Sequence, residues 1–219
     1  MARSGVASRP RGGAPAGAAT RLALVEAAIE TLKADGFAAT SARAIAARAG
    51  CNQALVFYHF GSVVDLLLAA LAEVSTRRMA RYRAALGAVS TPAELTEVAA
   101  DVFREDMDSG DAAVLVEMIA GASSTPGLGA QVAARVSPWR DFARHAIEAG
   151  LSGSPLASVV PLAELSHAVV ALYLGLEMLS HLDGDRSRAT ALFDRAGQLA
   201  MLLDALTTTR PRTTTEETP

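Results

Sequence analysis

Helical periodicity runs almost without interruption through this chain, and it constrains the fold more than any other feature. Apolar residues recur at spacings of three and four, as in Val25, Ala28, Ile29 and Leu32, and no stretch shows the sustained apolar and polar alternation of a strand. The sequence therefore predicts an all-α protein. Its 219 residues, 51% of them apolar, suffice for one substantial core or two small ones.

Capping residues, glycines and prolines divide this pattern into about nine helices. Thr20 is expected to cap the first helix, Gly36 to end it, and Ser41, Asn52 and Ser62 to begin the next three. The predicted helices span about 21–35, 42–49, 53–59, 63–86, 92–107, 112–122, 128–149, 161–182 and 187–206, the seventh with a bend near Pro138.

Charge is unevenly distributed along the chain. Residues 1–86 hold 11 Arg or Lys against 5 Asp or Glu, which gives +6, whereas residues 87–219 hold 9 against 18, which gives −9. A basic first part suits contact with a polyanion, and an acidic second part suits a module that must avoid one. The alternative is an accident of surface composition.

Two short helices joined by Ala49-Gly50-Cys51-Asn52 have the features of a helix-turn-helix. Small residues stand where the two helices cross, and a glycine stands where the backbone turns. The second helix, 53–59, is short for a core helix but long enough to place its first turn in a DNA major groove.

The stretches Thr40 to Ala46, Ala49 to Phe60 and Asp65-Leu66-Leu67 resemble the DNA-binding domain of the TetR family of bacterial transcriptional regulators. The resemblance covers about residues 20–68 and includes the closing aromatic-His-Phe signature. It implies a DNA-binding domain at 20–66 and a helical effector-binding and dimerisation domain at 67–206. Residues 1–19 and 207–219 are expected to be disordered tails, because little in them can pack.

Base-reading residues are expected on the first exposed turn of the second short helix. Val56 and Phe60 of that helix are expected to pack against the first short helix. There Gln53 can pair with adenine and Leu55 can meet a thymine methyl, while Arg43 can contact guanine or a phosphate. The resemblance assigns phosphate contacts to Tyr58 and His59, although His59 could instead be structural, and Leu55 and Phe57 could be core. The predicted DNA-binding residues are Thr40, Ser41, Arg43, Gln53, Ala54, Leu55, Tyr58 and His59.

Three positions depart from the family pattern. Val63 stands where the family usually has a phosphate-binding Lys, Leu55 replaces a small or hydroxyl residue, and Phe57 replaces a Tyr. These changes weaken the transfer of any particular operator sequence to this chain.

A helix-turn-helix protein reads enough base pairs only as a pair, so a homodimer on a pseudo-palindromic operator is expected. The last two helices carry apolar stripes suited to a four-helix interface, although the stripes could instead close the protomer's own core. The predicted dimer residues are Leu165, Val169, Leu172, Leu176, Leu192, Leu199 and Leu203.

The family resemblance also implies a small-molecule effector pocket among the middle helices, and a repressor that the effector releases from DNA. Glu117 is the polar residue expected to turn inward, while Arg77 to Arg83 and Asp106 with Asp108 are expected on solvated helix surfaces. The predicted pocket residues are Phe103, Met107, Glu117, Met118, Trp139, Phe142 and Tyr173.

Other classes of function find little support. No metal or other cofactor is expected, because the histidines lack metal-ligand spacing, and no catalytic motif is present. A helical protein-protein adaptor without specific DNA binding remains an alternative, favoured by Val63. The lone Cys51 and the lack of a signal peptide indicate the cytoplasm, and the apolar window at 167–176 is too short to span a membrane.

Overall fold

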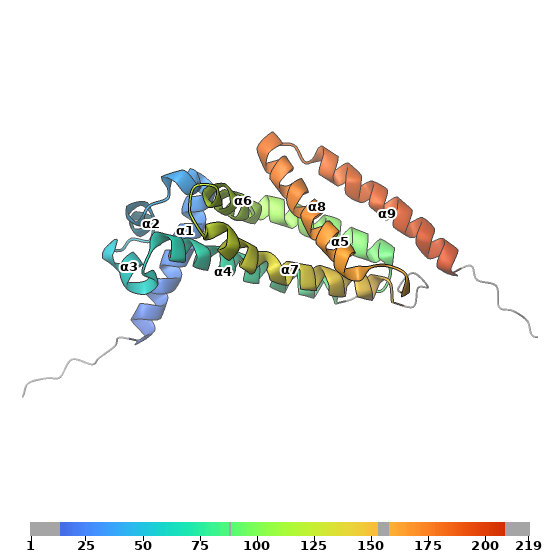
Figure 1. The fold of residues 1–219 in the computed structure, drawn as a ribbon, viewed down its shortest axis with the longest axis horizontal. Helices are drawn as coiled ribbons and strands as arrows, with labels where there is room; N and C mark the ends of the chain where they lie inside the picture. Colours follow the sequence, from blue (N-terminus) through green and yellow to red (C-terminus); the bar gives the residue numbers. More distant parts are fainter. Residues whose placement is uncertain (1–13, 88, 153–157, 209–219) are drawn as a thin grey trace, which may run out of the picture. The chain divides into compact units, whose positions relative to one another are not determined.

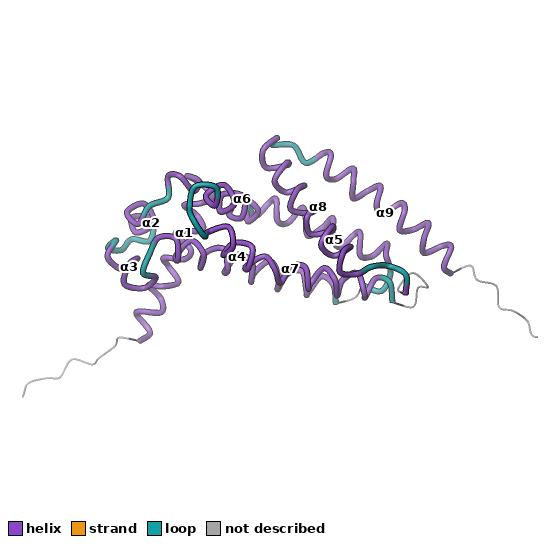
Figure 2. The backbone as a smooth tube through the Cα atoms, in the orientation of Figure 1, coloured by secondary structure: helices purple, strands orange, loops and turns teal. Residues whose placement is uncertain are grey.

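The computed structural model describes residues 14–87, 89–152 and 158–208, and within these ranges every regular element is an α-helix (Figure 2). The all-α prediction is therefore confirmed, with nine helices in the described part of the chain. Figure 1 shows their order: α1 (Ala14–Ala39), α2 (Ala42–Arg48), α3 (Ala54–Phe60), α4 (Val63–Leu86), α5 (Pro92–Ser109), α6 (Asp111–Ala122), α7 (Leu128–Gly150), α8 (Leu162–Asp183) and α9 (Ser187–Thr208).

Local capping chemistry sets most of these boundaries. The Ser41 hydroxyl accepts a hydrogen bond from the Ala44 amide at 3.2 Å, and Thr91 with Glu94 forms a complete capping box ahead of Pro92. At Gly36 the backbone takes φ 75° and ψ 174°, which interrupts α1 as predicted and suits a residue without a Cβ.

The start of the first helix was predicted wrongly. Thr20 does not cap α1, because the helix begins at Ala14 and so includes six residues that were expected to be tail. The alanine-rich sequence there has a high intrinsic helix propensity, which outweighed the missing apolar stripe. The expected tails at 1–13 and 209–219 lie outside the described residues.

The chain divides into two compact units, residues 1–70 and 71–219. In the first, α1 packs on α2 and α2 on α3 around buried side chains that include Leu24, Ile29, Ile45 and Val56. The predicted boundary after residue 66 and this division both fall within α4.

In the second unit the closest helix pairs are α5 with α9 and α7 with α8, and these can be followed side by side in Figure 1. Helix α6 packs on α7 and α8 and has the most continuous buried stretch, from Asp111 to Leu115. Phe103, Met118 and Leu128 are among the largest fully buried side chains of this core.

Among the described helices, α8 alone is long and apolar enough to span a membrane by length and composition, unless α3 and α4 are counted together as one bent span. The prediction from the window at 167–176 was too restrictive, because α8 has 22 residues with a mean hydropathy of 1.4 in its best window. Glu177 of this helix is buried and paired with Arg78, so α8 contributes a charged group to the interior of the bundle.

Candidate nucleic-acid interface and ligand cavity

Hydrogen bonds from side chains and backbone define the approach to α2 and the turn between α2 and α3. Thr40 Oγ1 donates to the Gly36 carbonyl at 2.6 Å, which fixes the approach to α2. Gly50 turns the chain with φ 65°, and Asn52 Oδ1 accepts from the Ala54 amide at 2.8 Å to begin α3. The expected capping role of Ser41 is thus confirmed. The N-cap residue of α3 is Gln53, one position after the predicted Asn52, whose side chain nevertheless accepts from the first helical amide.

Helix α3 has one buried side and one exposed side. Val56 is completely buried with Ile45 and Ala46 of α2, and Phe60 is half-buried beneath the guanidinium of Arg21, whose Cζ lies 4.9 Å from the ring centroid. These contacts hold the short helix in place and leave its outer surface free for another molecule.

The predicted DNA-binding residues lie on α2 and α3, in the turn between them, and at Thr40 and Ser41 directly before α2. Ser41, Arg43, Gln53 and Ala54 are exposed, and Tyr58 has 81% of its surface exposed. Thr40, Leu55 and His59 are half-buried, and the Tyr58 and His59 rings contact each other edge to face at 4.9 Å between centroids. The structure thus brings these residues together, while their contacts with DNA stay a prediction.

The alternative that Phe57 is a core residue is wrong, because 51% of its surface is exposed. Val56 occupies the buried position of the helix, so its neighbour Phe57 points away by about 100° of helical rotation. The outer surface of α3 therefore carries two aromatic side chains, Phe57 and Tyr58.

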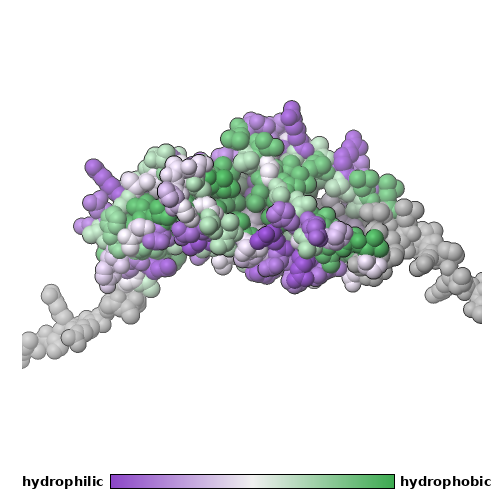
Figure 3. Space-filling view, viewed as in Figure 1, coloured by the Kyte–Doolittle hydropathy of each residue, from purple (hydrophilic) through white to green (hydrophobic). Residues whose placement is uncertain are grey.

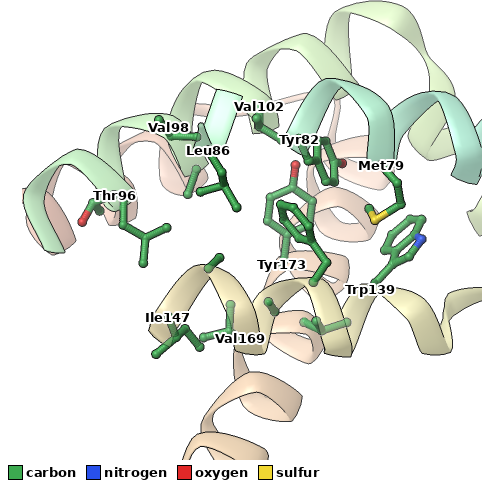
Figure 4. Close-up of a pocket in the computed structure, with 16 residues that line it drawn as sticks. Met79, Tyr82, Leu86, Thr96, Val98, Val102, Trp139, Ile147, Val169 and Tyr173 are labelled. Atoms are coloured by element: carbon green, nitrogen blue, oxygen red, sulfur yellow. The ribbon is translucent and has the colours of Figure 1, made fainter. Parts of the chain in front are cut away.

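The second unit contains a cavity of about 270 Å³ between α4, α5, α7 and α8 (Figure 4). Its lining is apolar and aromatic, and Figure 4 shows Tyr82, Tyr173 and Trp139 gathered at one end with Val98 and Thr96 toward the other. The lining residues are Met79, Tyr82, Leu86, Leu95, Thr96, Val98, Ala99, Val102, Trp139, Phe142, Ala143, Ala146, Ile147, Val169, Val170 and Tyr173.

Three of the seven predicted pocket residues, Trp139, Phe142 and Tyr173, line this cavity. Phe103 and Met118 do not line it and are buried in the protein core, and Met107 and Glu117 are half-buried outside it. Helix periodicity showed which residues face inward but not which of them border an unfilled space.

A buried ionic network lies behind the aromatic end of the cavity. Arg78 of α4 donates to Asp106 of α5 at 2.8 Å and also pairs with Glu177 of α8, and all three side chains are at most 2% exposed. The hydroxyls of Tyr82 and Tyr173 both donate to Asp106, the second at 2.8 Å. The network therefore joins three helices through side chains that also shape the cavity wall.

Arg81 extends this network toward the surface, where it pairs with Asp106 at 2.7 Å and Asp111 at 3.4 Å. The expectation that Arg77 to Arg83 forms a solvated helix surface is wrong for Arg78, and Asp106 is no exposed helix end. The partners of Arg78 lie 28 and 99 residues away in the sequence, so no local pattern could reveal these ion pairs.

Burial and charge shift the pKa values of this network in directions that follow from its geometry. Burial acts to lower the pKa of Arg78, but attraction to Glu177 and Asp106 outweighs it and the net shift is upward. Burial raises the pKa of Glu177 to about 7 against the lowering influence of Arg78. Burial also raises the pKa values of Tyr82 and Tyr173, which keeps both hydroxyls protonated as donors.

Helices α8 and α9 expose much of their apolar surface, and hydrophobic residues gather over this region in Figure 3. Of the predicted dimer residues, Leu172 is 55% exposed and Leu199 is 63% exposed, while Leu176 is half-buried. Val169 is 39% exposed and also lines the cavity. Leu165 and Leu192 are exposed as well, and the side chain of Leu203 lies outside the described residues.

Within the described residues, no group of three or more His, Cys, Asp or Glu side chains is arranged to hold a metal ion. The fully buried charged groups of the second unit, Arg78, Asp106 and Glu177, are paired with one another. In the described part of the chain, the apolar cavity and the outer surface of α3 are two places where the chain offers a site to another molecule.

Comparison with known proteins agrees with this geometry. Residues 24–70 match the family model described as bacterial regulatory proteins, tetR family. No curated protein matches the sequence.

Solved structures of similar fold cover more than four fifths of the chain. A member of the TetR family from Streptomyces coelicolor A3 is 26% identical with a TM-score of 0.59, over 81% of this chain and 97% of that one. The fatty acid degradation regulator FadR from Bacillus halodurans is 14% identical with a TM-score of 0.69, over 88% and 96%. FadR from Bacillus subtilis, solved in complex with stearoyl-CoA, is 14% identical with a TM-score of 0.69, over 82% and 96%.

Proposed function

This chain belongs to the TetR family of bacterial regulatory proteins, a family of DNA-binding transcription regulators, and from that premise we propose that it is a homodimeric repressor that a small molecule releases from its operator. The proposal assigns it a regulatory and not a catalytic role, in the bacterial cytoplasm where its DNA target lies. One observation carries the proposal furthest: a seven-residue helix, α3, is anchored by buried Val56 and presents Tyr58 outward, with exposed Gln53 directly before its first residue.

In this proposal Gln53 and Arg43 read base edges and Tyr58 and His59 hold phosphates. Gln53 has the bidentate amide that matches adenine, and the Arg43 guanidinium matches guanine. Both side chains are exposed on adjoining short helices, which supports a shared groove. Thr40 and Ser41 lie at the start of α2, where hydroxyl and amide groups suit a phosphate.

A second copy of the chain is proposed to cover the apolar surface of α8 and α9. Leucines such as Leu172, Leu179 and Leu199 are each more than half exposed in the single chain, an arrangement that burial against a twin would stabilise. Pairing also supplies two reading helices, whose spacing must match one helical turn of DNA, ~34–36 Å, or a multiple of it.

The cavity is proposed to hold the effector, and α4 to carry its effect to the reading helix. Tyr82 lines the cavity and lies on α4 with Arg78, and α4 begins at Val63, shortly after α3 ends at Phe60. A ligand that displaces Tyr82 or Tyr173 disturbs their bonds to Asp106 and so shifts α4. DNA is released because the ligand favours an arrangement in which the two reading helices are wrongly spaced.

The proposal is tested by binding the full-length protein to a DNA fragment from upstream of its own gene, in competition with scrambled DNA of the same composition. A regulator retains the native fragment selectively, and its affinity falls steeply as salt rises, because bound phosphates release counterions. An adaptor that has kept only the fold shows no selective retention on that fragment or on any other genomic fragment.

A further inference from the structure

The wall of the cavity carries no charged side chain. Sixteen residues line it, and only four of them, Tyr82, Thr96, Trp139 and Tyr173, have a side-chain nitrogen or oxygen. Aliphatic and aromatic carbon forms the rest of the lining, as Figure 4 shows around Leu86, Val98 and Ile147. Any polar recognition of a ligand by these side chains therefore depends on those four residues.

Each of the four already uses its hydrogen-bond donor within the protein. Trp139 Nε1 donates to Ser75 Oγ at 2.7 Å, and Thr96 Oγ1 donates to the Pro92 carbonyl at 2.7 Å. Tyr173 Oη donates to Asp106 at 2.8 Å, and Tyr82 Oη donates to the same carboxylate. The lining side chains have no donor left for an anionic ligand group.

The ionic network behind the wall does not supply the missing donor. Arg78 does not line the cavity, it is fully buried, and its charge is matched by Asp106 and Glu177. Its Nη1 atom has no hydrogen-bond partner among the described residues, but the guanidinium carbon lies 4.4 Å from the centroid of the Trp139 ring, which packs against it.

A cationic ligand is disfavoured for a related reason. Such a ligand would be recognised by aromatic rings, yet Trp139 and Tyr82 already face the Arg78 guanidinium, at 4.4 and 5.7 Å from its central carbon. A second positive charge beside these rings is repelled by the first. A charged group of either sign would thus lose its hydration in this cavity without a partner to replace it.

We propose that the cavity takes a compact, uncharged and predominantly apolar molecule. This inference rests on the proposed function, because it names the chemical class of the effector. The cavity volume of about 270 Å³ is just below the usual range of ligand pockets, ~300–1,000 Å³, which favours a compact ligand. Because the wall offers no partner for a charge, compounds whose recognition needs a buried carboxylate, phosphate or ammonium group are excluded as ligands.

Trp139 makes the inference testable, because it is the only tryptophan of the chain and lines the cavity. The neutral dye N-phenyl-1-naphthylamine is titrated into the full-length protein without DNA, and energy transfer from Trp139 is followed. Its sulfonated analogue, 1-anilinonaphthalene-8-sulfonate, is the charged counterpart. Octan-1-ol, octanoate, octylammonium and octanoyl-CoA then compete for the bound neutral dye.

We expect octan-1-ol to displace the dye at a concentration at least about tenfold lower than octanoate or octylammonium, because only the alcohol enters without losing ionic hydration. Ala143→Leu, which adds three carbons to the wall and so narrows the cavity, should weaken energy transfer from Trp139 to the dye. Val98→Lys, which places an ammonium group in the wall, should reverse the preference toward octanoate. Val159→Lys is the matched control, because Val159 is 77% exposed and does not line the cavity.

Equal or tighter binding of octanoate, octylammonium or octanoyl-CoA to the wild-type protein would overturn the inference, and so would a failure of every neutral probe to reach Trp139. Val98→Lys and the wild-type measurements keep the test decisive even if Ala143→Leu does not fold. Neutral probes that bind the cavity but leave DNA retention unchanged support the ligand class and count against the proposed release from the operator.

Discussion

Arg78 Nη2 donates to Asp106 Oδ2 at 2.8 Å, and both side chains have no exposed surface. A charged pair so completely removed from water persists only because each partner balances the charge of the other and further groups bond to both. Glu177, Tyr82 and Tyr173 are those further groups here. The pair therefore links the stability of the second unit to the shape of the cavity wall.

Loss of one partner should strongly destabilise the protein. Arg78→Met leaves Asp106 buried and without its main counter-charge, and we expect the free energy of unfolding to fall by about 3–5 kcal/mol. Urea denaturation followed by circular dichroism measures this change. Arg77→Met is the control on the same helix, since the Arg77 and Glu73 side chains are 40% and 37% exposed, and its expected cost is below about 1 kcal/mol. Equal effects of the two substitutions would show that the buried pair has no special role.

Stability should also depend on pH through Glu177. Its pKa is about 7 in the folded protein and 4.5 without the fold. Between pH 4.5 and pH 7 the folded protein therefore holds a proton on Glu177 that the unfolded chain has lost. The stabilising contribution of Glu177 is therefore complete below pH 4.5 and is lost as the pH rises to about 7.

Glu177→Gln should remove that part of the pH dependence, because the amide does not titrate. Unfolding free energies measured from pH 4.5 to pH 8 should fall more steeply in the wild type than in this variant. Glu164→Gln, an exposed position in the first turn of the same helix, should retain the wild-type slope. Parallel curves for wild type and Glu177→Gln would rule out the assignment.

The sequence predicted the helices better than the sites because helix signals are local. Ser41 and Thr91 act on amides three residues away, and Gly36 acts through its own backbone, so each is readable in a short window. The role of Arg78 depends on partners contributed by α5 and α8, and its neighbouring arginines made it look exposed. Val56 was correctly placed as buried, while Phe57 shows that an aromatic residue on a surface helix need not be core.

Tyr58 should contribute affinity for DNA without contributing selectivity. Because its hydroxyl is proposed to bond a phosphate, Tyr58→Phe should weaken binding to native and scrambled fragments by the same factor, about tenfold. The salt dependence should stay unchanged, since no charge is removed. Fluorescence anisotropy titrations at several salt concentrations measure both quantities. A loss confined to the native fragment would instead make Tyr58 a base-reading residue.

The apolar surface of α8 and α9 should control the oligomeric state. Leu172→Glu and Leu199→Glu each place a carboxylate on a side chain more than half exposed in the single chain, so the fold should persist while the dimer is lost. Light scattering coupled to size-exclusion chromatography measures the mass. Val159→Glu, at 77% exposure ahead of α8, should remain dimeric. A wild-type protein that stays monomeric at all concentrations would contradict the proposed interface.

The most direct test of the account is the ability of Gln53 and Arg43 to discriminate native from scrambled DNA. Gln53→Ala and Arg43→Ala should each reduce the difference in binding free energy between native and scrambled DNA by about 1–3 kcal/mol for each lost bidentate base contact. Arg104→Ala, at an exposed arginine of α5, should leave this difference unchanged. Competition titrations with the full-length protein give this difference. If both α2 and α3 variants keep wild-type selectivity, the outer surface of α3 does not read DNA and the proposed function is wrong.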